Sequence, residues 1–82
     1  MDAKTFHLII TAVSGAKFDG EAVSVTVPGS AGEMTLLAGH EPLVSTLQQG
    51  TITARGVGAG EQDIDIQGGV IECVGNLVTV LL

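Results

Sequence analysis

The sequence predicts an all-β domain: a flattened β-sandwich of two antiparallel sheets with about ten short strands. Three observations support this fold class. Apolar and polar residues alternate with a period of two in several segments. Turn-forming residues, mostly glycine, separate these segments at short intervals. No long window carries the apolar spacing of an amphipathic helix without an interrupting glycine or proline.

The individual strands are predicted from this alternation. In the clearest case, residues 22–27, three valines alternate with small residues. The segment 42–47 could form a short helical turn, but its Val, Ser and Thr favour an extended chain and Pro42 suits a strand start. The predicted strands are 6–10, 22–27, 42–47, 51–55, 63–66 and 77–82, and the predicted turns are 14–15, 19–20, 28–29, 49–50, 56–60, 68–69 and 75–76.

Length and charge restrict the function. The 82 residues predict one domain, 1–82, with little core to spare for a deep catalytic cleft. Nine acidic residues against three basic ones give a net charge of −6, which disfavours nucleic acid and anionic lipid as partners. No apolar stretch approaches the roughly 18 residues of a membrane span, so we expect no direct membrane insertion and a membrane location only through a partner.

Histidine and cysteine are too few for a structural zinc site, because only His7, His40 and Cys73 are present. Cys73 has no partner for a disulfide within the chain and lies in an apolar run, which indicates a reducing compartment and an unreactive thiol. His7 is predicted to lie on the sheet surface. No nucleophile, acid and base form a recognisable set, so the sequence predicts neither an enzyme nor a cofactor.

Two glycine-rich segments and one row of acidic residues are interpreted as structural features and not as binding sites. The segments 15–17 and 56–60 do not match the phosphate-binding motifs, and we interpret 56–60 as a hairpin loop. Glu61, Asp63 and Asp65 fall on one face of a strand whose other face carries isoleucines, which is typical of a strand with one side in water. The alternative is a free-standing sandwich that binds a cation or a small molecule through these three carboxylates.

The segment 28–44 resists so simple an interpretation. It contains three glycines and two prolines, more backbone-shaping residues than a plain meander requires. Two explanations remain open for it, structural corners or a contact surface held by the sandwich.

Six segments, read together, carry a resemblance to a known family: 6–8, 18–20, 28–33, 39–43, 68–72 and 76–81. In this order they resemble the amino-terminal domain of the epsilon subunit of F-type ATP synthases, called delta in mitochondria. The resemblance covers nearly the whole chain and implies a flattened sandwich of two five-stranded sheets.

The resemblance also implies a function, that of a non-catalytic central-stalk subunit coupling proton flow to ATP synthesis. It implies two partners, the gamma subunit and the c-ring, and a peripheral position on the cytoplasmic side of the energy-transducing membrane. Glu33 matches the position that meets the c-ring loops, while Gly39, His40 and Ser45 match positions facing gamma. The family's carboxy-terminal helical hairpin is absent from 1–82, so we expect none of the functions that those helices carry.

Overall fold

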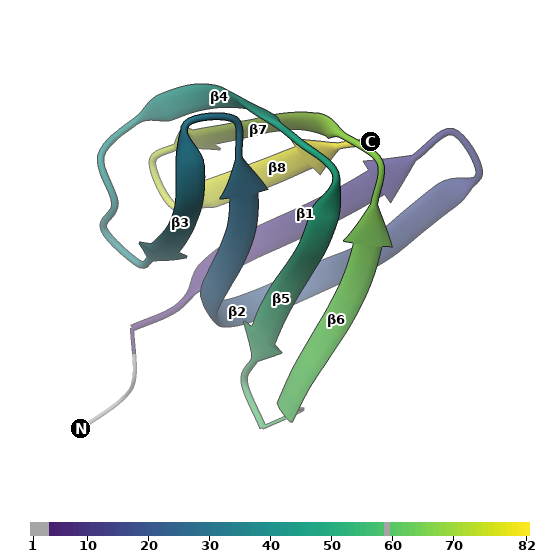
Figure 1. The fold of residues 1–82 in the computed structure, drawn as a ribbon. Coiled ribbons are helices and arrows are strands. Elements are labelled where there is room, and N and C mark those ends of the chain that lie inside the picture. Colours follow the sequence, from purple (N-terminus) through teal and green to yellow (C-terminus); the bar gives the residue numbers. More distant parts are fainter. Residues whose placement is uncertain (1–3, 59) are drawn as a thin grey trace.

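The computed structural model describes residues 4–58 and 60–82, which form eight strands and no helix (Figure 1). No described segment is a helix of the length and apolarity that crossing a membrane requires. The strands are β1 (Phe6–Ala12), β2 (Gly15–Gly29), β3 (Gly32–Leu37), β4 (Leu43–Leu47), β5 (Gly50–Gly56), β6 (Gly60–Ile66), β7 (Gly69–Val74) and β8 (Leu77–Leu81).

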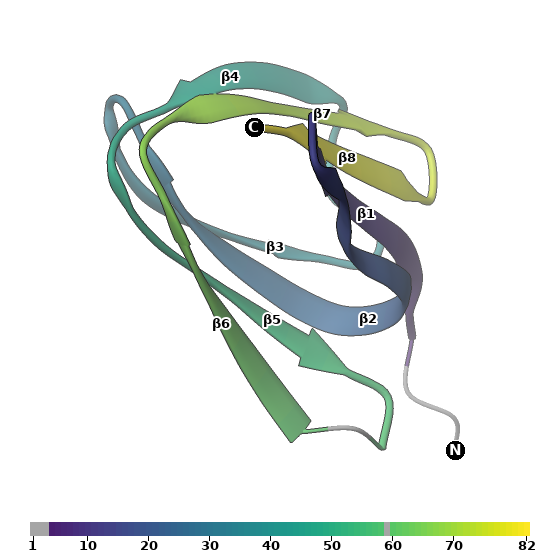
Figure 2. The same cartoon turned by 90° about the vertical axis from the view of Figure 1, so that its right-hand side faces the viewer.

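The strands form two layers that share β2. The first layer holds the amino-terminal half of β2 followed by β1, β8, β7 and β4, and the second holds β3, the carboxy-terminal half of β2, β5 and β6. Figure 2 shows β4, β7 and β8 on one side of the molecule and β2, β5 and β6 on the other. With extents of 37 × 24 × 18 Å, the sandwich is flattened. The fold class predicted from the sequence is confirmed.

Strand β2 passes from one layer to the other at an irregularity in its pairing. Ala22 pairs with Phe6 of β1 on one side and with Gly56 of β5 on the other. The register to β5 then shifts between Ala22 and Ser24, leaving Val23 as the extra residue of a bulge. Because a bulge bends and twists its strand, β2 can complete both layers without a break.

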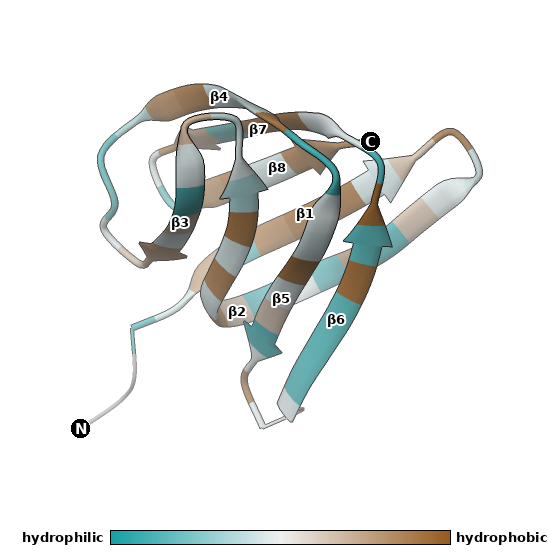
Figure 3. Cartoon of the chain, viewed as in Figure 1, coloured by the Kyte–Doolittle hydropathy of each residue, from teal (hydrophilic) through white to brown (hydrophobic). Residues whose placement is uncertain are grey.

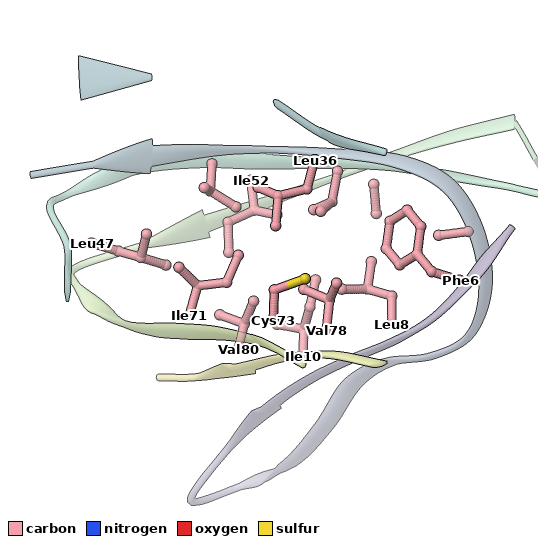
Figure 4. Packing of buried hydrophobic residues seen from close by; sticks show 14 of the residues in the cluster. Phe6, Leu8, Ile10, Leu36, Leu47, Ile52, Ile71, Cys73, Val78 and Val80 are labelled. Carbon is pink, nitrogen blue, oxygen red and sulfur yellow. The ribbon is translucent and has the colours of Figure 1, made fainter. Parts of the chain in front are cut away.

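The core lies between the layers and is made by the inward residues of the alternating strands. In β1, Phe6, Leu8 and Ile10 are at most 1% exposed, while the residues between them are half-buried. Figure 4 shows these side chains facing Leu36 and Ile52 of the other layer. Figure 3 shows the same alternation as brown and teal bands along the strands. The buried residues are Phe6, Leu8, Ile10, Ala22, Val25, Val27, Leu36, Leu47, Ile52, Ala54, Ile66, Ile71, Cys73, Val78 and Val80.

The structure agrees roughly with the predicted strand count and corrects some boundaries. The described residues form eight strands, close to the predicted count of about ten, and the single strand β2 runs for 15 residues. The predicted turns at 19–20 and 28–29 lie inside β2, and the turn that follows is at 30–31. Glycine or proline in these pairs does not interrupt β2, because cross-strand pairing with β1 and β3 holds it extended.

Two strands had not been predicted, β3 and β7. In β3, Leu36 is buried while Leu37 is exposed, so the apolar pair hides the alternation.

Sequence also gave no sign that β1 and β8 pair in parallel, the only parallel pairing among the described strands. β1 and β8 lie at opposite ends of the chain, and six other strands separate them in the sequence. A local sequence pattern cannot predict that two such distant strands pair.

Candidate functional site

Exposed apolar side chains gather on one face of the sandwich. Eight large apolar residues are exposed among the described residues, and five of them lie on β4, β7 and β8, where they point away from the core. We call these five the apolar face: Val44, Val70, Val74, Leu77 and Leu81. A monomer rarely leaves such a contiguous set in water, so the apolar face is a candidate partner surface.

Register brings the members of the apolar face together across three strands. Val74 pairs with Leu77, and Val70 pairs with Leu81, in the antiparallel pair of β7 and β8. Val44 of β4 lies beside Glu72, which sits between the two valines along β7. Directly opposed side chains of this kind lie within contact distance, so the five residues form one surface.

The outer face of the second layer is polar by contrast. Thr51 and Thr53 of β5 donate hydrogen bonds of 2.9 and 3.0 Å to Asp65 and Asp63 of β6. Arg55 donates to Glu61 at 2.6 Å. All three carboxylates are exposed, as the interpretation of a solvated strand face predicted, and each already has a partner on β5.

Glu33 is the second residue of β3, two residues after the turn at 30–31, and is exposed. Two glycines flank this turn, and Gly29 is needed because a Cβ there would lie 2.6 Å from the carbonyl oxygen of Gly32. The turn is fastened to β4: the Ser30 backbone N–H donates to the Thr46 carbonyl at 3.1 Å, and the two hydroxyls are 2.8 Å apart. Glu33 is therefore presented on a braced hairpin.

Gly39 and His40 lie beyond the other end of β3, in the connection to β4. Gly39 has a φ of 83°, a conformation that glycine adopts without strain. The His40 backbone N–H donates to the Leu37 carbonyl at 3.2 Å, and its ring Nδ1–H donates to the Glu41 carbonyl at 2.8 Å. The ring is exposed just before the start of β4 and is available to a partner there.

Ser45 lies in β4, but its side chain does not belong to the apolar face. It shares the side of the strand that carries buried Leu47, it is half-buried, and its hydroxyl donates to the Thr46 carbonyl at 3.2 Å. Val44 and Thr46 occupy the outward positions instead. The structure thus brings Ser45 close to Val44, holds Gly39 and His40 at the start of β4, and leaves Glu33 at the far end of β3.

His7 and Cys73 have the surroundings expected from sequence. His7 lies on the sheet surface, where its Nε2 is 2.7 Å from Asp19 and its Nδ1 is 3.4 Å from Glu21. Both carboxylates belong to the paired strand β2, so the contacts join two neighbouring strands. Cys73 is 2% exposed, and burial raises the pKa of its thiol above the ordinary value.

No cavity opens in the part of the chain that the structure describes. Within the same residues, no three His, Cys, Asp or Glu side chains are grouped so that they could hold a metal ion. Among the described residues, the candidate sites are therefore exposed surfaces, and the apolar face on β4, β7 and β8 is the main one.

The fold agrees with what comparison of the sequence finds. Residues 5–82 match the family described as ATP synthase, Delta/Epsilon chain, beta-sandwich domain. The chain belongs to this family. The resemblance seen in the sequence is thereby confirmed, and membership in this family agrees with the expectation of a subunit that is not itself an enzyme.

Curated relatives carry the corresponding name. The ATP synthase epsilon chain of Bordetella petrii is 40% identical over 77 residues, which cover 94% of this chain and 55% of that protein. The ATP synthase epsilon chain of Parvibaculum lavamentivorans is 42% identical over 64 residues, covering 78% of this chain and 48% of that protein. The chain thus spans about half the length of these relatives.

Solved structures share the fold. A chain of the Euglena gracilis mitochondrial ATP synthase, in a structure of OSCP, F1 and c-ring, superposes with a TM-score of 0.87 at 24% identity, covering 99% of this chain and 51% of that one. A chain in the central stalk and c-ring structure of the Tetrahymena thermophila mitochondrial ATP synthase gives 0.78 at 10% identity, covering 99% and 65%. At these identities the likeness concerns the fold.

Sequence reasoning missed most of the residues that shape the candidate surfaces. The members of the apolar face come from three strands, one of them not predicted, so no local pattern displays them as a set. Ser30 and Thr46 were also missed as a brace, because 16 residues separate them. Alternation in 77–82 was the only available signal, since it marked Leu77 and Leu81 as residues of one strand face.

Proposed function

We propose that this domain is a non-catalytic part of the central stalk of a rotary, proton-translocating ATP synthase, where it binds gamma and the c-ring and couples proton flow to ATP synthesis. One observation carries the proposal: a member of the delta/epsilon family exposes five large apolar residues on one sheet face. A rigid sandwich with such a face is suited to a subunit that holds gamma and the c-ring in a fixed relative position.

In this proposal the apolar face docks on gamma. Burial of apolar side chains supplies the binding free energy. His40 and Gly39 border the face where β4 begins, so in this proposal they contact gamma at the rim. Ser45 follows Val44 in β4 with its side chain on the inward side, so its proposed contact with gamma is through the backbone of β4.

The c-ring contact is proposed at the opposite end of β3, at Glu33. Its carboxylate is exposed on a hairpin that the Ser30 and Thr46 hydrogen bonds hold against β4. An anchored carboxylate can accept hydrogen bonds from polar or basic groups of the ring loops. Because Glu33 and His40 lie at opposite ends of β3, one domain can contact two bodies simultaneously.

This arrangement makes the domain peripheral to the energy-transducing membrane, on its cytoplasmic side, and attached through the complex. The 82 residues act in it as one β-sandwich domain. The proposal requires no cofactor, since the domain transmits torque and does no chemistry.

Binding to isolated gamma tests the first contact. We expect the chain and gamma of the same organism to co-elute as a one-to-one complex in size-exclusion chromatography. Val74→Asp, on the apolar face, should weaken this complex strongly, whereas Val57→Asp, in the turn after β5, should not. The two valines are a matched pair because they are 57% and 55% exposed. Failure of the unmodified chain to bind gamma would refute the proposal.

Binding of the chain with gamma to a c-ring tests the second contact. Glu33→Ala should weaken attachment to the ring and leave the affinity for gamma unchanged, because Glu33 lies at the opposite end of β3 from Gly39 and His40 and outside the apolar face. Glu61→Ala, on the outer face of the second layer, is the control. Equal losses in both variants would show that overall charge, and not the hairpin, determines attachment.

A further inference from the structure

Glu72 is a single carboxylate surrounded by the apolar face. It lies on β7 between Val70 and Val74, and its partners across the sheet are Val44 on β4 and Thr79 on β8. Leu77 and Leu81 occupy the diagonal positions on β8. The side chain is exposed on the outward side of the strand. An acidic group thus stands among the five residues of the apolar face, with the outward Thr46 and Thr79 as its polar neighbours.

The carboxylate of Glu72 differs from those on β2 and β6, which have partners. Asp63, Asp65 and Glu61 each accept a hydrogen bond from β5, and Asp19 lies against His7. Among the described residues, no hydrogen bond or ion pair reaches Glu72. Its charge is therefore compensated by water alone in the free domain.

Docking removes that water. A carboxylate buried without a partner costs several kcal/mol, far more than the apolar contacts of one neighbouring valine return. A partner that is apolar throughout would therefore bind this surface poorly. A partner that carries a cation opposite Glu72 would bind well and in a single orientation, because only one register aligns the two charges.

We propose that Glu72 determines the register of docking, by pairing with a lysine or arginine that stands alone within an apolar patch of the partner. The inference rests on the proposed function, in which the apolar face meets gamma, and it adds the chemistry that gamma must present there. The apolar contacts supply affinity, and the ion pair selects the partner and its orientation.

Affinity for gamma, measured by titration calorimetry at two salt concentrations, tests the inference. Glu72→Lys should weaken binding at least about 30-fold, because it places like charges together in a desolvated interface. Glu72→Gln should weaken it less and reduce its salt dependence. Glu61→Lys changes the net charge equally on the other layer and should leave the affinity nearly unchanged. Circular dichroism of each variant verifies the fold.

A reversal on the partner side completes the test. We expect one Lys→Glu or Arg→Glu variant of gamma to restore binding of the Glu72→Lys chain. That variant should have a higher affinity for the Glu72→Lys chain than unmodified gamma has. If Val74→Asp abolishes binding while Glu72→Lys binds as tightly as the unmodified chain, the role of Glu72 is refuted and the proposed function stands. If the unmodified chain does not bind gamma, the proposed function itself fails.

Discussion

Among single residues, Gly29 is subject to a constraint that Gly20, in the same strand, is not. A Cβ at Gly29 would lie 2.6 Å from the Gly32 carbonyl oxygen and 3.0 Å from a methyl carbon of Met34, whereas one at Gly20 would meet nothing within 4 Å. The hairpin that presents Glu33 therefore depends on a missing side chain.

We expect Gly29→Ala to lower the free energy of unfolding by about 1–3 kcal/mol, because the backbone must move to relieve the overlap. Gly20→Ala should leave it unchanged or slightly raised. Urea unfolding of both variants measures the difference. Equal effects would contradict the close approach described for the turn.

Cys73 is a residue whose chemistry is suppressed by its position. Burial raises the pKa of its thiol, so the folded state holds the proton where the unfolded state releases it. The stability due to this difference is complete at neutral pH and is lost as the pH rises through the pKa of the folded state.

We therefore expect the thiol to react with a disulfide reagent far more slowly in the folded chain than in urea. In alkaline solution the unmodified chain should lose stability relative to Cys73→Val, whose side chain does not ionise. The measurement is urea unfolding of both proteins across the alkaline range. If instead the unmodified chain gained stability relative to Cys73→Val as the pH rises, the thiol would not have a raised pKa in the folded state.

At the scale of elements, β3 contains two neighbouring leucines that differ in exposure. Leu36 is fully buried in the core, and Leu37 is 56% exposed on the outer side. The strand pairs with β2 alone among the described strands, with Leu36 opposite buried Val25. Its register decides which leucine contributes to the core.

Alanine substitutions report that register directly. Leu36→Ala should cost about 2–5 kcal/mol of unfolding free energy, since it leaves a cavity between the layers. Leu37→Ala should cost no more than about 0.5 kcal/mol. A larger effect at Leu37 would mean that β3 pairs one residue out of the described register.

At the scale of the whole molecule, the two outer faces of the sandwich differ in which side chains they expose without a partner. On the second layer, the carboxylates of β6 pair with Thr51, Thr53 and Arg55 of β5, so these groups already have partners. The first layer leaves apolar side chains in water. This asymmetry favours a protein partner on the first layer over a cation on the second.

Calcium titration of the domain should accordingly give no saturable heat. The carboxylates of β6 would have to exchange their bonds to β5 for a shared cation, and a site of six to eight oxygens is not assembled there. Asp63→Asn is the control for any heat observed. Saturable binding that disappears in this variant would revive the alternative of a cation-binding sandwich.

The sequence by itself determined the fold class and most strand positions. Alternation in 22–27 and 77–82 follows from the geometry of an extended chain, in which neighbouring side chains point to opposite sides. The solvated row at Glu61, Asp63 and Asp65 was predictable for the same reason. The glycine pairs gave the turns less reliably, because pairing with neighbouring strands overrode two of them.

Tertiary structure alone decided which residues share a surface. The bulge at Val23 sends β2 through both layers, β8 returns to lie beside β1, and β7 lies between β8 and β4. These pairings assemble the apolar face from three strands and place Glu72 within it. They join residues distant in the chain, so the information lies in how the sheets pack and not in any local pattern.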